Sequence, residues 1–318
     1  MNKHLFRLTI LIFVLGFSSA KAQSYDTLWN RFYHCDHYRI ADANRLLDSV
    51  EWKAQAENNE YQLLKVCLLR VGLYDRYGNW TTKQTAVYVD SIRKMRGYLY
   101  QPVYDYALGT LLRRAITYNY KRSSATHTDY HLLDEWSREE LTAAAEACFQ
   151  RAMDNCEHLL DFPIADYPFI ISDQWEQIPQ LCPTLFDLLV QSRIHLLENY
   201  LAATPMAVPQ LYDKAIRMHQ SPQDDKIRLS YELQRLRYFY DSKQLDTTAY
   251  EMALHELEQR YGSTNEAILY AWALYYYELN GTLFYHKAIS YFNALIQHSS
   301  DEYYVHNAQH YKEEIERK

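Results

Sequence analysis

Residues 266–300 have the sequence EAILYAWALYYYELNGTLFYHKAISYFNALIQHSS, and they contain the clearest repeat unit of the chain. Trp272, Ala288 and Phe292 have the spacing of the tryptophan, second-helix alanine and phenylalanine of a tetratricopeptide unit. A small alanine lets two helices approach closely, and the phenylalanine fills the groove beside it. The unit is degenerate, because Tyr276 replaces the usual small residue of the first helix and a serine replaces the usual final proline.

Helical periodicity extends through most of the chain. Ala145, Phe149 and Ala152 repeat the second half of the unit. Apolar residues at 3.6-residue spacing, separated by proline, glycine and serine breaks, predict a series of helices. These helices are expected near residues 40–50, 63–71, 84–98, 103–120, 138–160, 184–200, 207–219, 226–242, 247–261, 265–279, 283–297 and 302–316. The aromatic-rich stretch 161–183 has no helical period and is interpreted as an ordered connection.

The sequence therefore predicts an all-α fold in which tetratricopeptide-like antiparallel helix pairs stack as a solenoid. The composition agrees, because only 7 of 318 residues are glycine. Hairpin-rich and phosphate-cradling folds need many positions with positive φ, which glycine supplies. An irregular helical bundle is the alternative. We expect one helical repeat domain over residues 23–318, with a subdivision, if any, near 161–183 or 201–225.

Residues 1–22 have the pattern of a secretory signal peptide. A basic start precedes an apolar run from Leu8 to Phe17, and Ala20-Lys21-Ala22 provides an A-x-A cleavage site before Gln23. A buried N-terminal helix is the alternative interpretation. No cysteine follows the cleavage site, which argues against a bacterial lipid anchor. We expect a periplasmic or envelope protein without membrane insertion once the signal is removed.

Cleavage would leave an acidic protein. It removes three of the 33 basic side chains and none of the 40 acidic ones, so the mature chain has a formal charge of −10. A net acidic surface argues against nucleic acid and anionic lipid as partners.

Five cysteines lie in the mature part of the chain: Cys35, Cys67, Cys148, Cys156 and Cys182. An odd number leaves at least one thiol unpaired. We expect Cys148 and Cys156 on one helix, about 12 Å apart and too distant for a disulfide. Pairing of Cys35 with Cys67, or of Cys156 with Cys182, remains geometrically open. The other interpretation is that all five are small buried apolar residues.

Three histidine groups have spacings that could hold a metal, but none completes a known motif. His34-Cys35-Asp36-His37 lacks a second ligand pair at a standard zinc spacing, which favours a polar turn. His306 and His310 are four residues apart on an expected helix, but asparagine replaces the glutamate of H-E-x-x-H proteases. His127 and His131 lie in a Ser/Thr-rich stretch. We expect no metal, cofactor or catalytic residue, and hence no enzyme.

Tyrosines crowd the last three expected helices. Tyr275, Tyr276 and Tyr277 are consecutive and span about 200° of a helix, so they cannot all face the core. Tyrosine is favoured at interfaces because it combines a large rigid area with a polar tip. The first helix of the terminal pair should line the concave face of a solenoid. We therefore predict a protein-binding surface formed by Tyr270, Tyr275, Tyr276 and Tyr277.

Several short stretches recur in a characteristic order along the mature chain. They are SYDTLW at 24–29, AQAENN at 54–59, QLLK at 62–65, LDEWS at 133–137, PIADY at 163–167 and PTLFDLL at 183–189. Together they resemble the N-terminal helical region of the large bacterial alpha-2-macroglobulin family proteins. In that family the helical region precedes β-sandwich domains, a bait region and often a thioester domain. The resemblance implies a place among envelope protease-trapping proteins.

The trapping parts of that family have no counterpart here. Its thioester forms within a Cys-x-Glu-Gln motif, and none of the five cysteines begins one. The resemblance therefore implies a non-catalytic helical interaction module related to endopeptidase inhibitors. Its expected partner is a protein domain, namely a β-sandwich domain of the same or a split chain. Either the chain is a truncated or split gene product, or the helical module acts by itself.

Two other function classes remain open. A SusD-like glycan-binding protein would also be exported, helical and aromatic, but such proteins usually carry a lipid-anchor cysteine where Gln23 stands, and they are usually longer. An α/α-type glycosidase needs a deep cleft with paired carboxylates, and the sequence singles out no such pair.

Overall fold

The computed structural model describes residues 23–77, 80–95, 99–118, 129–170, 182–200 and 207–317. Within these residues the secondary structure is helical, and the one extended pairing is a β-bridge between Pro163 and Thr184. The all-α prediction is confirmed. The proposed signal peptide and its cleavage site after Ala22 lie at the edge of or outside the described residues and stay predictions.

The chain divides into two compact units, residues 1–152 and 153–318. The division falls in the last turn of a helix, upstream of the two breaks at which we expected a subdivision. Each unit has its own hydrophobic core.

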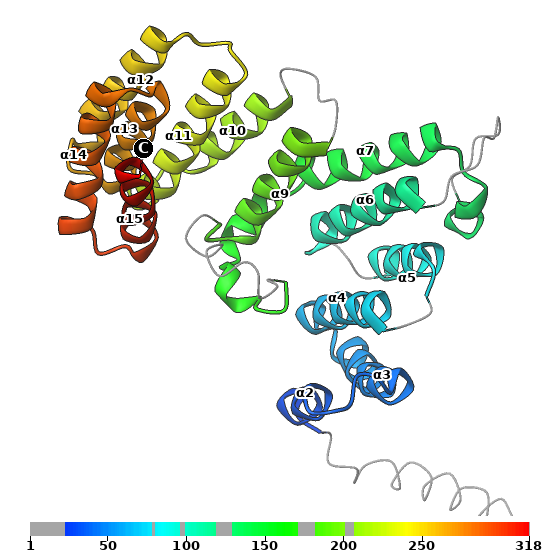
Figure 1. The fold of residues 1–318 in the computed structure, drawn as a ribbon. Coiled ribbons are helices and arrows are strands. Elements are labelled where there is room, and N and C mark those ends of the chain that lie inside the picture. The colour runs from blue at the N-terminus through cyan, green and yellow to red at the C-terminus, as the bar shows by residue number, and fades with distance from the viewer. Residues whose placement is uncertain are drawn as a thin grey trace, which may run out of the picture. The chain divides into compact units, whose positions relative to one another are not determined.

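The first unit consists of successive helices that pack on their neighbours in the chain (Figure 1). In the described residues these are α2 (Tyr25–Tyr33), α3 (Ile40–Glu57), α4 (Glu60–Tyr77), α5 (Thr82–Met95), α6 (Gln101–Tyr118), the short η1 (Tyr130–Glu135) and α7 (Arg138–Asp154). Helix α2 is an addition to the expected set. The sequence explains its start, because the Ser24 hydroxyl accepts a hydrogen bond from the Thr27 amide.

A close approach of α6 to α7 depends on one glycine. A Cβ atom placed on Gly109 would lie 2.7 Å from the Phe149 ring, which is fully buried. Phe149 is the residue that the repeat pattern assigned to the groove-filling position of its helix. Its ring occupies the space that a side chain at position 109 would need.

The second unit also consists of successive helices. It contains η2 (Glu157–Asp161), η3 (Ile164–Asp166), α9 (Leu185–Tyr200), α10 (Ala207–Met218), η4 (Pro222–Asp224), α11 (Asp225–Asp241), α12 (Thr247–Tyr261), α13 (Glu266–Leu279), α14 (Thr282–His298) and α15 (Glu302–Glu316). Besides their sequence neighbours, α11 contacts α13, and α13 contacts α15. These three alternate helices therefore form one layer, which we call the inner layer.

The terminal helix pair packs as the repeat pattern predicts. Trp272, Ala288 and Phe292 are all buried in one core cluster, which joins α13 to α14. Figure 1 shows α13, α14 and α15 side by side at the C-terminal end. Adjacent pairing is thus confirmed, whereas the regular stacking of all pairs as a solenoid stays a prediction.

One expected helix boundary is wrong. Helix α7 ends at Asp154, so Cys156 does not share a helix with Cys148. After Asp154 the chain turns into η2, where the Leu159 amide bonds the Cys156 carbonyl and the Leu159 side chain is buried. All five cysteines are free thiols, and all except the half-buried Cys35 are buried. The interpretation of these four as small core residues fits.

Candidate functional site

A groove of about 910 Å³ opens on the inner layer of the second unit. Residues of α9, α10, α11, α12, α13 and α15 line it. Six of the lining residues are tyrosines: Tyr212, Tyr238, Tyr250, Tyr270, Tyr303 and Tyr304. Four of these side chains are only partly buried, at 238, 270, 303 and 304, so their rings are accessible from the groove. We call this feature the tyrosine groove.

A second hollow of about 540 Å³ adjoins the tyrosine groove. It lies at the first turns of α11, α13 and α15, and it shares Ser230, Ala267, Tyr303 and Tyr304 with the groove. The shared walls make the two hollows neighbours along the same layer.

Helix α13 separates this groove from the core of the terminal pair. Ala267, Tyr270, Ala271 and Leu274 line the groove at i, i+3, i+4 and i+7, which is one face of a helix. The opposite side carries Ile268, Trp272, Tyr275 and Tyr276, all of which are buried. The helix is thus apolar on both sides, and its groove-lining residues also border the core cluster.

The four predicted binding tyrosines therefore occupy different environments. Tyr270 lines the groove. We expected Tyr275 and Tyr276 to present an accessible face. The structure corrects that expectation, because the two side chains are only 2% and 9% exposed. Tyr276 stacks on Trp272 and Tyr291 with ring centroids 5.8 and 5.9 Å apart. The reason is that α12 and α14 both pack on this side of α13.

Tyr277 is half-buried on a third side of α13. Its ring lies 5.0 Å from that of Tyr311, which places it against α15 and away from the groove. Of the four predicted tyrosines, Tyr270 is the one whose position suits contact with a partner protein. Such docking stays a prediction.

Burial raises the pKa of most of the groove tyrosines. It raises the pKa of Tyr250 and Tyr304 to about 12, and it raises the pKa of Tyr212 and Tyr270 as well. At neutral pH the hydroxyls are therefore neutral hydrogen-bond donors and acceptors rather than nucleophiles or bases. One of them, Tyr212, donates to Glu198 Oε1 at 3.5 Å.

Charged side chains fix one edge of the groove. The Arg237 guanidinium donates to Asp241 at 2.8 Å and to Glu278 at 2.5 Å, which joins α11 to α13. Both carboxylates raise the pKa of Arg237 against the opposing effect of burial. Because Arg237 already has two carboxylate partners, it contributes little free positive charge to the groove.

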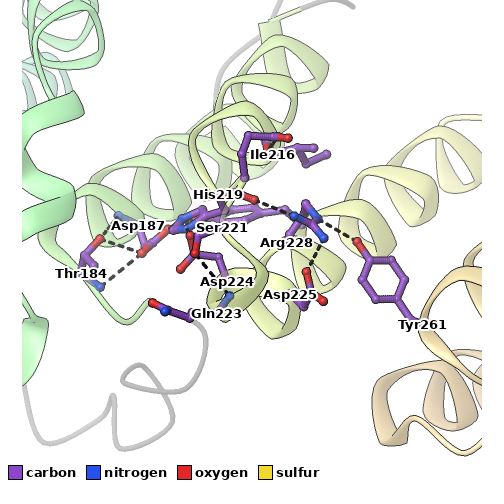
Figure 2. A network of polar contacts seen from close by, with 12 residues as sticks. Thr184, Asp187, Ile216, His219, Ser221, Gln223, Asp224, Asp225, Arg228 and Tyr261 are labelled. Atoms are coloured by element: carbon purple, nitrogen blue, oxygen red, sulfur yellow. Dashed lines mark hydrogen bonds and ion pairs between the residues drawn. The ribbon is translucent and has the colours of Figure 1, made fainter.

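A separate polar network is buried where α9, α10 and α11 meet (Figure 2). The Asp187 carboxylate accepts hydrogen bonds from Tyr231 Oη and His219 Nε2, each at 2.8 Å, and from the Thr184 hydroxyl at 2.7 Å. Thr184 and Asp187 also exchange bonds with each other's backbone amides, as in a capping box at the start of α9. The Tyr231 hydroxyl has a pKa raised well above its usual value by burial and by Asp187.

This network resembles a catalytic histidine–carboxylate pair only in the hydrogen bond between His219 and Asp187. The second ring nitrogen of His219, Nδ1, faces Asp224 at 3.9 Å instead of a serine, threonine or cysteine nucleophile. Arg228 closes the arrangement by donating to the His219 carbonyl and to the Tyr261 hydroxyl (Figure 2). The geometry suits a structural clasp that joins three helices.

The histidine groups of the sequence form no metal site in the described residues. No group of three or more His, Cys, Asp or Glu side chains there could hold a metal ion. His34 and His37 bond the backbone carbonyls of Asn30 and Phe32, as expected for a polar turn. His306, His310 and His131 are exposed, and His127 lies outside the described residues.

Sequence reasoning missed most of the groove. The sequence analysis assigned no role to Tyr212, Tyr238, Arg237 or Glu198. In each helix, the positions that face the groove hold the same kinds of apolar or polar residues as any other helix position. One signal was available in α13, where the four groove residues repeat at i, i+3, i+4 and i+7. Without a second helix to compare, that stripe is indistinguishable from a core stripe.

No protein-family model, curated protein or solved structure matches the chain. The likeness to the alpha-2-macroglobulin family therefore rests on the quoted sequence stretches alone. Among the described helices, none combines the length and apolarity needed to cross a membrane.

Proposed function

We propose that this chain is a non-catalytic helical interaction module that binds an extended segment of a partner protein in the tyrosine groove. The observation that carries the proposal is the groove itself, in which partly exposed tyrosine rings line a concave surface across three inner helices. Tyrosine suits such a surface because its ring offers contact area at a small entropic cost and its hydroxyl bonds backbone groups. The tyrosine hydroxyls of the groove supply hydrogen-bond donors and acceptors, which supports a binding role.

Glycan binding is a second candidate, and one observation favours it. The tyrosine rings lie beside the polar side chains of Gln234, Arg237 and Asp241 on the same groove wall. Sugars bind by stacking on aromatic faces while their hydroxyls bond such groups. This corresponds to the SusD-like alternative of the sequence analysis.

A groove-filling variant tests the proposal. Ala271 is partly buried on the groove face of α13 and borders the core cluster, so Ala271→Trp should fill the groove, and the helicity of the variant shows whether the core tolerates it. Thr248→Trp is the matched control, because Thr248 is exposed on α12 and does not line the groove. The full chain and both variants would be probed with arrays of extended peptides and of oligosaccharides, with helicity measured in parallel.

We expect peptides to bind the wild-type chain and Thr248→Trp but not Ala271→Trp, with helicity unchanged. Binding of oligosaccharides in place of peptides, lost in the same variant, would establish the glycan-binding alternative. Peptide binding that survives Ala271→Trp would place the interaction elsewhere.

The envelope location and the relation to alpha-2-macroglobulin-like proteins are part of the same proposal. They are supported by the residues 1–22 pattern and by the stretches quoted above. Expression with the native N-terminus and sequencing of the exported chain tests the location. The expected first residue is Gln23, and a retained Met1 or a lipid on the first residue would contradict it.

A further inference from the structure

The charges around the tyrosine groove are unequal. Five acidic and three basic side chains line the groove and its adjoining hollow: Glu198, Asp225, Asp241, Glu266 and Asp301, against Lys226, Arg237 and Arg260. The imbalance matches the acidic character of the whole chain. It gives the surface a preference for positively charged ligands.

The three basic side chains are already paired. Lys226 lies 3.5 Å from Asp301, Arg237 is held by Asp241 and Glu278, and Arg260 donates to Glu232 at 2.9 Å. Neighbouring carboxylates therefore offset the positive charge of all three.

Two of the acidic side chains, unlike the three basic ones, have no ion-pair partner of this kind in the described part of the chain. Among the described residues, neither Glu198 nor Glu266 forms an ion pair with a lysine or arginine. Glu198 accepts the long bond from Tyr212, and Glu266 accepts one from the Ser300 amide at 3.2 Å. Within that part of the chain, the groove and its adjoining hollow thus each hold a carboxylate without a lysine or arginine partner, and His195 is the basic group that acts on Glu198.

The tyrosine rings add a second preference for cations. A lysine or arginine placed over an aromatic face within about 6 Å gains electrostatic stabilisation. The chain makes such contacts itself: Lys287 Nζ lies 4.7 Å from the Tyr276 ring centroid, and Lys65 Nζ lies 4.2 Å from that of Trp29. In the groove the partly exposed rings of Tyr238, Tyr270, Tyr303 and Tyr304 are available for the same contact.

The dimensions suit an extended segment. The groove crosses α11, α13 and α15, and packed helices lie about 8–10 Å apart, so its length is about 20 Å. An extended chain rises about 3.3 Å per residue, so about six residues span that length.

We infer that the occupant of the tyrosine groove is an extended peptide segment of about six residues that carries lysine or arginine. This inference rests on the proposed function, because it specifies the partner of the same groove. Cationic side chains lie over the tyrosine rings, and the carboxylates of Glu198 and Glu266 provide the countercharge at the two hollows.

The test uses three labelled seven-residue peptides in which alanine alternates with lysine, glutamine or glutamate. Binding to the full chain is measured by fluorescence anisotropy at low and at physiological salt. We expect the lysine peptide to bind at least about tenfold more tightly than the glutamine peptide at low salt, and salt to reduce this difference. The glutamate peptide should bind most weakly.

Two charge-neutralising variants of equal size locate the interaction. Glu198→Gln should weaken binding of the lysine peptide about three- to fivefold, as expected for one exposed charge pair. Glu256→Gln, at an exposed site on α12 outside the groove, is the control and should leave binding unchanged. Both keep the acceptor and the side-chain length, so folding should not be affected.

The outcomes separate the two claims. Equal, salt-insensitive binding of the lysine and glutamine peptides would overturn the inferred charge preference and leave the proposed function standing. A lysine preference that is equally weakened by Glu256→Gln would show general attraction to an acidic chain and also overturn the inference. If none of the three peptides binds, both the inference and the proposed function fail.

Discussion

Asp187 and His219 are in direct contact inside the second unit, with His219 Nε2 2.8 Å from Asp187 Oδ1 and both side chains buried. The two residues belong to helices that pack on each other, because Asp187 lies in the first turn of α9 and His219 directly follows α10. Tyr231 of α11 bonds the same carboxylate oxygen. One carboxylate therefore satisfies polar groups from three helices at once.

Removal of the Asp187 charge should destabilise the second unit. In Asp187→Asn the amide nitrogen faces a donor, so at least one buried partner loses its acceptor. We expect the free energy of unfolding to fall by about 2–4 kcal/mol, the range for an unsatisfied buried group or a broken buried pair. Urea unfolding followed by circular dichroism measures it. Glu256→Gln, at an exposed acid, should change the value by less than about 0.5 kcal/mol; an equally small effect of Asp187→Asn would contradict a structural role.

Gly72 and Gly109, which lie inside described helices, should respond to alanine in opposite directions. Gly109→Ala places a methyl group 2.7 Å from the buried Phe149 ring, and overpacking of that kind costs about 1–3 kcal/mol. At Gly72 of α4 nothing lies within 4 Å, so alanine should stabilise by up to about 1 kcal/mol through its better helix propensity. Thermal unfolding of both variants compares them. Stabilisation by Gly109→Ala would show that α6 and α7 are farther apart than described here.

The cysteines should react as four protected thiols and one accessible thiol. Burial raises the pKa of Cys67 and Cys182 to about 12 and that of Cys156 to about 11, which disfavours the reactive thiolate. Cys35 is half-exposed and should react first with a thiol reagent in the native state.

Counting thiols checks this assignment. Five should react after denaturation without reductant, and Cys35→Ser should remove the early phase alone. Fewer than five thiols in the unreduced, denatured protein would instead indicate one of the disulfides that the sequence left open.

Alkaline pH should destabilise the second unit through its groove tyrosines. The folded pKa of Tyr250 and Tyr304 is about 12, above the value near 10 of an unfolded chain. Their contribution to stability is therefore complete below pH 10 and is lost as the pH rises from 10 through 12. Tyrosinate absorbance and helicity, recorded together in one titration, measure this. Titration of every tyrosine near pH 10 would contradict the burial of Tyr250 and Tyr304.

Local spacing was enough to predict the helices, but not which of their faces stays open. Trp272, Ala288 and Phe292 identify a tight helix pair because their contacts are set within 20 residues of sequence. Thr184 is a local partner of Asp187, but the other two partners lie 32 and 44 residues away, so local sequence does not reveal that this carboxylate joins three helices. The same limit applies to α13: Tyr270 and Tyr276 are identical side chains on one helix, and only the packing of α12 and α14 buries the second.

Tyr276→Ala tests that distinction between core and groove. Because the ring is 9% exposed and stacks between Trp272, Phe284 and Tyr291, its loss leaves a cavity in the terminal core. We expect the free energy of unfolding to fall by about 3–5 kcal/mol, as for other buried aromatic truncations. Binding of the lysine peptide, corrected for the folded fraction, should stay unchanged, since the ring faces away from the groove. Tyr270→Ala should lower the free energy of unfolding less than Tyr276→Ala does, but it should clearly weaken binding of the lysine peptide. If instead Tyr276→Ala abolished binding in a chain that remained folded, the docking surface predicted from the three consecutive tyrosines would be right and the assignment to the tyrosine groove would be wrong.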